Sequence, residues 1–351
     1  MTQTQKIVFE LVHKAIDLEY ELNSVVFVGA DWNKVYRFAM AHSLSHITFE
    51  ALGQLPRECR PDKRLLMNWY GQVSMQEGQY EQKWQVACEL ADLWAKEGVS
   101  ALVLKGRSIA QYYPVPSHRC SCDLDLFIEE GWDRACTTLE AKGIKLVYEV
   151  YKEAEFSWKG VYVECHRYIT PVRGNQNLSN FELYLRSMLQ AEPTNFFKDS
   201  LLIQPPLMFT VFLCLEHALW DFLHGVLTLK HLVDWMVLRR QNVDWKLFDE
   251  KCGELKFDRF LRLINTLVDV IEGKQEYEEL PPSYQRAFDE IMHIQSAPKK
   301  KVKRSWFKRR VLTAVEIIES RRRYAEFGYC SMLSFLINST WTHFFEKEVK
   351  L

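Results

Sequence analysis

Between residues 98 and 177, short apolar runs and period-two alternation replace the helical periodicity found on both sides. The clearest run is "SCDLDLFI", residues 121–128, which predicts a buried strand carrying two aspartates. A segment of this length is at the small end for a domain, so we expect flanking helices to cover its sheet. The pattern predicts an α+β fold in which a small mixed β-sheet core is flanked by N- and C-terminal helical regions.

The chain is therefore expected to have three regions: an N-terminal helical region over 1–97, the core over 98–177, and a C-terminal helical region over 178–351. In the first region, Asp31 is the expected N-cap of a helix. In the third, the whole sequence from about residue 178 is expected to be helical.

Inside the core, "VSALVLKG" predicts a strand that ends at Gly106, and "RSIAQYY" predicts about two helical turns. "IKLVYEVY", "AEFSWKG" and "VYVECHRYI" predict three further strands. A tight Lys159-Gly160 turn should join the last two as a hairpin.

Composition narrows the class of protein. The formal net charge is -1 over 351 residues, so any attraction to phosphate must come from local patches. The most apolar window, 206–229, is interrupted by Glu216, Asp221 and two histidines, which argues against a membrane span. Nine cysteines without a CxxC pair and an N-terminus unlike a signal peptide predict a cytoplasmic protein with reduced thiols.

Asp123 and Asp125 stand at positions i and i+2 of the predicted strand, so their side chains share one face. Two carboxylates this close repel unless a cation lies between them. Glu164 shares a face of a later strand with Tyr162 and His166, and it can join the aspartates if the two strands are neighbours. Three such oxygen ligands suit Mg²⁺, with Mn²⁺ as an alternative, and can hold two ions for an in-line phosphoryl displacement.

A lone D-x-D pair on an apolar strand can also mark an edge strand or a solvated face. Here a Lys105-Gly106 turn and a helix start precede it, an arrangement that brings backbone amides near phosphate. Lys105 and Arg119 could add positive charge against a triphosphate. We therefore favour a site for metal and nucleotide.

These residues resemble the nucleotidyltransferase superfamily that includes DNA polymerase β, with its glycine-serine turn, D-x-D pair and later third acid. More closely, the chain resembles a bacterial family described only as uncharacterised nucleotidyltransferases. The shared elements occur in order: Leu104-Lys105-Gly106, Tyr113-Pro114, Arg119, Asp123-Leu124-Asp125, Glu164-Cys165-His166, then His217, Lys230 and Asp234 in the C-terminal helices. Arg107 departs from the superfamily pattern of glycine or serine after the glycine, and Ser108 follows one place late.

The resemblance implies transfer of a nucleoside monophosphate from an NTP, ATP included, to an acceptor, with pyrophosphate leaving. It implies that Asp123, Asp125 and Glu164 are the catalytic residues and hold two Mg²⁺ ions. The nucleotide-binding residues it implies are Lys105, Gly106, Arg107, Ser108, Arg119, His166, Lys230 and Asp234. The acceptor stays open between a small molecule, a peptide, a protein and RNA.

Two alternatives use the same fold. One is a catalytically silent protein that binds a nucleotide or a partner in the same cleft. The other is a toxin-like enzyme that modifies RNA. The basic run "KKKVKRSWFKRR", residues 299–310, could make weak contacts with nucleic acid, but such runs are more often solvated faces.

Three histidines, His217, His224 and His231, recur every seven residues. Gly225 is expected to break the helix, and histidines at this spacing lie too far apart along one helix to bind one ion. We therefore expect no metal site here. For His217, with Lys230 and Asp234, the expectation is a structural role or a place in the wall of a nucleotide pocket.

Overall fold

The computed structural model describes residues 1–149, 152–172, 175–191, 194–293 and 320–337. The predicted nucleic-acid contact at 299–310 lies outside these residues. The chain divides into two compact units. The helical unit comprises Met1–Met75, Cys214–Gln241 and Lys256–Met332, and the sheet unit comprises Gln76–Leu213, Asn242–Leu255 and Leu333–Leu351.

The sheet unit holds a 7-stranded mixed sheet with the order β3-β4-β5-β2-β1-β7-β6 among the described residues. Its strands are β1 (Ala101–Val103), β2 (Leu124–Phe127), β3 (Val147–Glu149), β4 (Glu153–Trp158), β5 (Val161–His166), β6 (Asn195–Phe196) and β7 (Leu202–Gln204). Strand β2 pairs parallel with β5 and antiparallel with β1, and β1 pairs parallel with β7. The predicted α+β class, a small mixed sheet flanked by helices, is confirmed.

The predicted hairpin is present between β4 and β5. Lys159 and Gly160 form its two-residue turn with φ values of 50° and 80°, and Trp158 pairs with Val161 directly after it. Positive φ at both central residues matches the twist of the flanking strands, which is why such turns need glycine. The turn fixes the register of every later pair in the hairpin.

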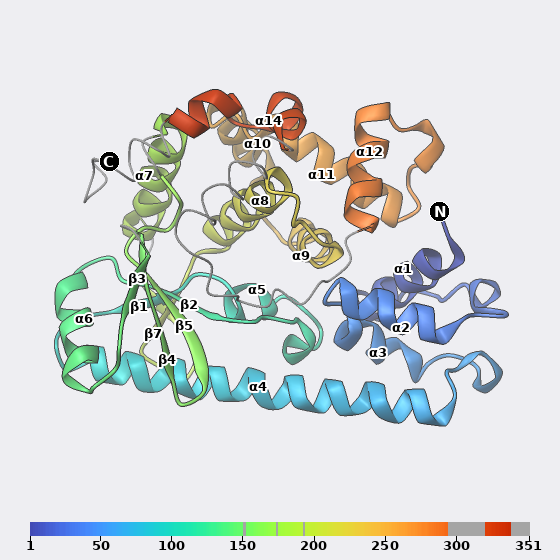
Figure 1. Ribbon diagram of the computed structural model, residues 1–351, viewed down its shortest axis with the longest axis horizontal. Helices are drawn as coiled ribbons and strands as arrows, with labels where there is room; N and C mark the ends of the chain where they lie inside the picture. Colours follow the sequence, from blue (N-terminus) through green and yellow to red (C-terminus); the bar gives the residue numbers. More distant parts are fainter. Residues whose placement is uncertain (150–151, 173–174, 192–193, 294–319, 338–351) are drawn as a thin grey trace, which may run out of the picture. The chain divides into compact units, whose positions relative to one another are not determined.

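One face of the sheet is packed against helices. Alternate residues of β2 and β5, from Leu124 to Cys165, contribute to a buried core with residues 86–94 of α4 (Lys63–Ala95) and with α6 (Trp132–Ala141). Figure 1 shows the strands beside the C-terminal half of α4. Burial of this apolar face contributes most to the stability of the unit, at roughly 25 cal/mol per Å². The opposite face carries Asp125, Glu164 and His166.

The expectation of an entirely helical sequence after residue 178 is wrong for 195–204, where β6 and β7 add an edge to the sheet. Strands of two and three residues are too short to show alternation, so the sequence pattern could not reveal them. Asp199 turns the chain between them with φ of 57°, and Leu202 is fully buried. These strands lie between α7 (Gln176–Ala191) and α8 (Leu207–Leu223).

The remaining helices among the described residues of the sheet unit are short. They are α5 (Arg107–Ala110), the 3-10 turn Pro116–His118 and α10 (Trp245–Glu254). The predicted helix "RSIAQYY" thus closes after one turn instead of about two, and a 3-10 turn follows it before β2.

The helical unit contains the other described helices. They are α1 (Gln3–Ile16), α2 (Trp32–Ala41), α3 (Ser45–Leu52), α9 (Leu229–Arg239), α11 (Asp258–Ile271), α12 (Pro282–Met292) and α14 (Arg321–Phe327), with 3-10 turns at Ser24–Phe27, Arg57–Cys59 and Tyr277–Glu279. Asp31 caps α2 as predicted, because its carboxylate accepts from the Lys34 amide at 3.1 Å.

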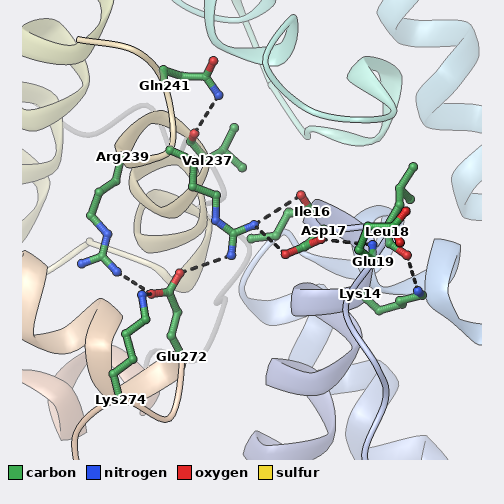
Figure 2. Close-up of polar contacts among 11 residues, drawn as sticks. Lys14, Ile16, Asp17, Leu18, Glu19, Val237, Arg239, Gln241, Glu272 and Lys274 are labelled. Carbon is green, nitrogen blue, oxygen red and sulfur yellow. Dashed lines mark hydrogen bonds and ion pairs between the residues drawn. The ribbon is translucent and has the colours of Figure 1, made fainter.

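A network of charges joins α1, α9 and α11 within the helical unit (Figure 2). The Glu272 carboxylate accepts from Arg239, from Arg240 at 3.3 Å and from Lys274 at 2.6 Å. Arg240 also donates to the carbonyl of Ile16, the last residue of α1, at 3.4 Å. The side chain of Glu272 is only 7% exposed, so these cations neutralise a carboxylate that has lost most of its water.

Within the ranges that the structure describes, every helix is too short or too polar to cross a lipid bilayer.

Candidate active site

Asp125 lies at the centre of the polar face of the sheet. It belongs to β2, its side chain is 2% exposed, and it contacts two basic groups. Its Oδ1 lies 2.9 Å from Lys105 Nζ and accepts a hydrogen bond from His166 Nε2 at 3.1 Å. Burial raises the pKa of Asp125, but Lys105 and His166 outweigh burial and hold this pKa well below its ordinary value. Asp125 therefore stays ionised.

Glu164 is the direct neighbour of Asp125 across the sheet, because the two residues are register partners in the parallel pairing of β2 with β5. Its Oε2 lies 3.8 Å from His166 Nε2. Burial, together with the charges of Asp125 and Asp123, raises the pKa of Glu164 to about 7. Burial and the neighbouring carboxylates therefore disfavour the ionised form of Glu164.

Asp123 directly precedes β2 and lies near the charges of Asp125, Lys105 and Lys83. Burial and the charge of Asp125 raise its pKa, while Lys105 and Lys83 act in the opposite direction. Asp123 lies outside the group of ligand atoms formed by Asp125, Glu164 and His166, which are all within 4.8 Å of one another. Of the predicted acidic triad, Asp125 and Glu164 thus lie together with His166, and Asp123 is not part of that group.

The donor set fits a divalent cation. Two carboxylates with raised pKa values are groups whose negative charge lacks compensation, and a dication supplies it. Carboxylate oxygens suit Mg²⁺ and Mn²⁺, whereas the Nε2 atom of His166 already donates to Asp125 and orients it. Oxygen atoms of Asp125 and Glu164 therefore fit as ligands, and a metal-binding role of Asp123 stays a prediction.

The basic residues Lys105 and Arg107 flank Gly106 in a turn that precedes β2 in the chain. Gly106 has φ of 63°, a conformation that L-residues with a side chain rarely adopt, and the chain there turns from β1 into α5. Arg119, only 4% exposed, donates to the Gly106 carbonyl at 3.2 Å and so stabilises the turn that carries Lys105. The attraction of Asp125 and Asp123 outweighs burial and raises the pKa of Lys105, which remains an ammonium.

A pocket opens beside these residues in the sheet unit. Its walls combine aromatic, basic and acidic side chains with the turn; the lining residues are Tyr80, Lys83, Trp84, Val103, Lys105, Gly106, Arg107, Arg119, Ser121, Asp123, Leu124 and Asp125. Four cations and two carboxylates therefore face one space, which is the charge pattern expected for a metal-bound polyphosphate.

Arg107 forms part of the pocket wall by stacking on two aromatic rings of α4. Its guanidinium carbon lies 4.1 Å from the Trp84 ring centre and 4.9 Å from that of Tyr80. Its Nη1 atom is buried and makes no hydrogen bond with a described residue. The stacking preorganises the guanidinium at a small cost in entropy.

Ser108 is fully buried, and its hydroxyl donates to the Leu104 carbonyl at 2.9 Å. Its side chain therefore closes the first turn of α5. Lys230 and Asp234 belong to the helical unit, where they form an ion pair with each other at 3.3 Å. Their nucleotide-binding role stays a prediction.

Sequence reasoning missed Glu153. On β4 it is the register partner of His166, and its Oε2 lies 3.0 Å from His166 Nδ1 without hydrogen-bond geometry. Although burial raises the pKa of Glu153, His166 and Lys152 lower it to about 2, so it stays ionised. The Lys159-Gly160 turn could have revealed Glu153, because a hairpin with this two-residue turn pairs residue 153 with residue 166.

Lys83 and the aromatic pair on α4 were also missed. Lys83 donates to the Ser121 carbonyl, and burial lowers its pKa. The helical pattern of α4 gives no sign of these contacts, because its boundaries and face depend on how the helix packs against the sheet.

Comparison with curated proteins and with solved structures gives no match. A family model described as "Uncharacterised nucleotidyltransferase" matches residues 29–271, which include both the turn at Gly106 and the carboxylates of β2 and β5. The match covers more than half of the chain, and the chain belongs to this nucleotidyltransferase family.

Proposed function

We propose that the protein transfers a nucleoside monophosphate from an NTP to a hydroxyl of an acceptor and releases pyrophosphate, with Mg²⁺ as the metal and Mn²⁺ as a substitute. The observation that carries the proposal is the side-by-side placement of Asp125 and Glu164, next to a pocket that also contains four cations. Membership of a nucleotidyltransferase family supports a nucleotide as substrate.

In this proposal Asp123 and Asp125 hold the ion bound to the triphosphate, and with Glu164 they hold a second one. When bound, Mg²⁺ neutralises phosphate charge and makes the acceptor hydroxyl more acidic. Glu164, which a bound ion would keep ionised, or a neighbouring group would help to accept the proton of that hydroxyl.

The basic residues of the pocket bind the phosphates in this proposal. Lys105 lies 2.9 Å from Asp125, so its ammonium can stay close to the reacting phosphate while it balances the carboxylates. Arg107 offers a guanidinium held against Trp84, a geometry suited to phosphate oxygens. His166 keeps Asp125 in place instead of contacting the nucleotide.

Nine cysteines without a CxxC pair are typical of a protein with reduced thiols, and we place the reaction in the cytoplasm. The acceptor can be a small molecule, a peptide, a protein or RNA. A toxin-like enzyme acting on RNA would share this chemistry and differ only in the acceptor.

A silent binding protein is the second candidate. The ion pair of Lys105 with Asp125 favours it, because this pair already neutralises one carboxylate without a metal. The raised pKa values of Asp123 and Glu164 favour the enzyme, since a protein that only binds has no need for two uncompensated acids.

The test is incubation of the protein with each labelled NTP, Mg²⁺ and cell extract, followed by measurement of pyrophosphate and of labelled product. The double change Asp123→Asn with Asp125→Asn should abolish metal-dependent pyrophosphate release, and Glu130→Gln, an exposed acid after β2, should not change it. Equal turnover by the double variant and the wild type would exclude the proposed reaction. Nucleotide binding without turnover would favour the silent protein.

A further inference from the structure

A second cluster of ligand-type side chains lies in the helical unit, apart from the proposed catalytic residues. It consists of His217 and Asp221 on α8 and His231 on α9. One ligand atom from each lies within 4.8 Å of the other two. The cluster overturns the sequence argument against a metal site here, which treated the histidines as points along one helix.

The turn between α8 and α9 brings the histidines together. Gly225 has φ of 72°, and a Cβ atom at this position would come within 2.7 Å of the Arg323 guanidinium. The positive φ is the reason that glycine is favoured here, and a side chain at this position would also require the Arg323 guanidinium to shift. The ring centres of His217 and His231 then lie 5.6 Å apart, with an angle of 60° between the ring planes.

Two separations within the cluster are close to those between ligands of one ion, and the third is within 4.8 Å. Asp221 Oδ2 lies 3.0 Å from His231 Nε2 and 3.8 Å from His217 Nε2. Ligands about 2.0–2.1 Å from a tetrahedral Zn²⁺ are about 3.3 Å apart. Small rotations of two side chains are therefore enough to reach this geometry.

His231 also contacts Thr228, the N-cap residue of α9, through Nδ1. The Thr228 amide donates to Nδ1 at 3.2 Å in a capping box, and Nδ1 lies 3.2 Å from the Thr228 hydroxyl oxygen. Metal binding through Nε2 requires the proton on Nδ1, so it would replace the capping bond with donation from Nδ1 to the Thr228 hydroxyl.

We propose that His217, Asp221 and His231 bind a first-row transition dication of the Zn²⁺ class. Two imidazole nitrogens and one carboxylate suit Zn²⁺, whereas Mg²⁺ prefers oxygen ligands alone. Three protein ligands leave one coordination position for water or an added ligand. His217 is 36% exposed, so solvent and the ion can reach the site. By joining α8 to α9, the ion stabilises the helical unit.

The experiment uses the full chain, freed of metal by chelation and kept with a reductant and excess Mg²⁺, which fills the carboxylate site. Co²⁺ is titrated as a spectroscopic probe and then displaced by Zn²⁺. We expect one equivalent of Co²⁺ with the intense visible bands of four-coordinate geometry, without the charge-transfer band of a cobalt–thiolate bond. The melting temperature should rise with Zn²⁺.

Four variants locate the ion. His217→Gln and Asp221→Asn should weaken Co²⁺ binding by at least about tenfold and should no longer gain melting temperature with Zn²⁺. His224→Gln, the third histidine of the same sequence pattern, should bind like the wild type. The double variant Asp123→Asn with Asp125→Asn should also bind like the wild type, which separates this site from the proposed catalytic one.

The proposal is overturned if the wild type binds no stoichiometric Co²⁺, if the thiolate band appears, or if His224→Gln loses as much affinity as His217→Gln. Circular dichroism of the metal-free variants shows whether each is folded. If one of the two ligand variants does not fold, the other decides the outcome.

Discussion

Glu153 and Asp125 contact opposite nitrogens of the same imidazole ring, that of His166. Glu153 Oε2 lies 3.0 Å from Nδ1, and Asp125 Oδ1 lies 3.1 Å from Nε2. Glu153, His166 and Asp125 therefore form a row of side chains across three adjacent strands, β4, β5 and β2. Asp125, at the end of this row, is a carboxylate that we propose binds metal. Because the strands fix the row, its geometry forms before any ligand arrives.

Glu153→Gln should lower the turnover number of the proposed transfer by about tenfold or more, with little change in KM for the NTP. Loss of this charge weakens the orientation of His166 and hence of Asp125, but it removes no contact with the nucleotide. Steady-state kinetics measures the turnover number and KM separately. Glu130→Gln, an exposed acid after β2, is the control and should retain turnover; a rise in KM alone would contradict a positioning role.

Glu164→Gln should stabilise the metal-free protein at pH 8 by roughly 2–3 kcal/mol while it abolishes transfer. The pKa of Glu164 is raised from 4.5 to about 7, so the folded state holds its proton more tightly than the unfolded state does. Stability from this group is therefore complete below about pH 4.5 and is lost as the pH rises through about 7.

Denaturant unfolding of both proteins at pH 5 and pH 8, with and without Mg²⁺, measures this effect. Mg²⁺ should stabilise the wild type at pH 8 more than the variant. If the variant is less stable than the wild type at pH 8 without metal, ionised Glu164 does not destabilise the folded protein.

Lys105→Met should raise KM for the NTP by more than tenfold, since the pocket loses the cation closest to Asp125. It should also raise the pKa of Asp125, which Lys105 holds low. Activity in the variant should therefore fall more steeply at acid pH than in the wild type. Lys142→Met, an exposed residue after α6, is the control, and an unchanged KM in Lys105→Met would remove Lys105 from the phosphate-binding set.

Glu272→Gln should destabilise the protein by about 2 kcal/mol at pH 7, because three cations lose their shared acceptor. The pKa of Glu272 is lowered: burial raises it, but hydrogen bonding from Lys274 and the charges of Arg239 and Arg240 prevail. Its stabilisation is thus present above the ordinary pKa of 4.5 and lost as the pH falls below it.

Thermal unfolding across this pH range tests the effect of Glu272. The difference between wild type and Glu272→Gln should shrink toward pH 3. Glu279→Gln, on the 3-10 turn that follows α11, provides a control of the same chemistry and should unfold like the wild type. A difference that persists unchanged at pH 3 would mean that the carboxylate charge is not the cause.

The sequence predicted those parts of the site that depend on local pattern. Alternation in "SCDLDLFI" gave the strand with Asp125, and the Lys159-Gly160 turn gave the hairpin with Glu164 and His166. That β2 and β5 are neighbours is a long-range pairing with no local signature, so the convergence of Asp125 with Glu164 could only be a hypothesis. The same holds for Lys83, which reaches the pocket from α4.

For the histidines, the argument from sequence spacing was wrong about the separation of His217 and His231. Spacing along one helix argued that His217 and His231 stay apart, and the sequence even contained the break, Gly225, that invalidates this argument. The direction in which a chain leaves a glycine depends on packing against other segments, here Arg323. Sequence alone could locate the break but not the reversal.

Strand β7 has a practical consequence for dissecting the chain. An excised fragment of 98–177 would leave β1 with a bare hydrogen-bonding edge, because its parallel neighbour is Leu202–Gln204. It would also lack the apolar cover of Leu90 and Trp94. Such a fragment would self-associate through that edge. Isolated expression of the sheet therefore has to start near residue 76 and extend beyond 204, so that the fragment includes strand β7.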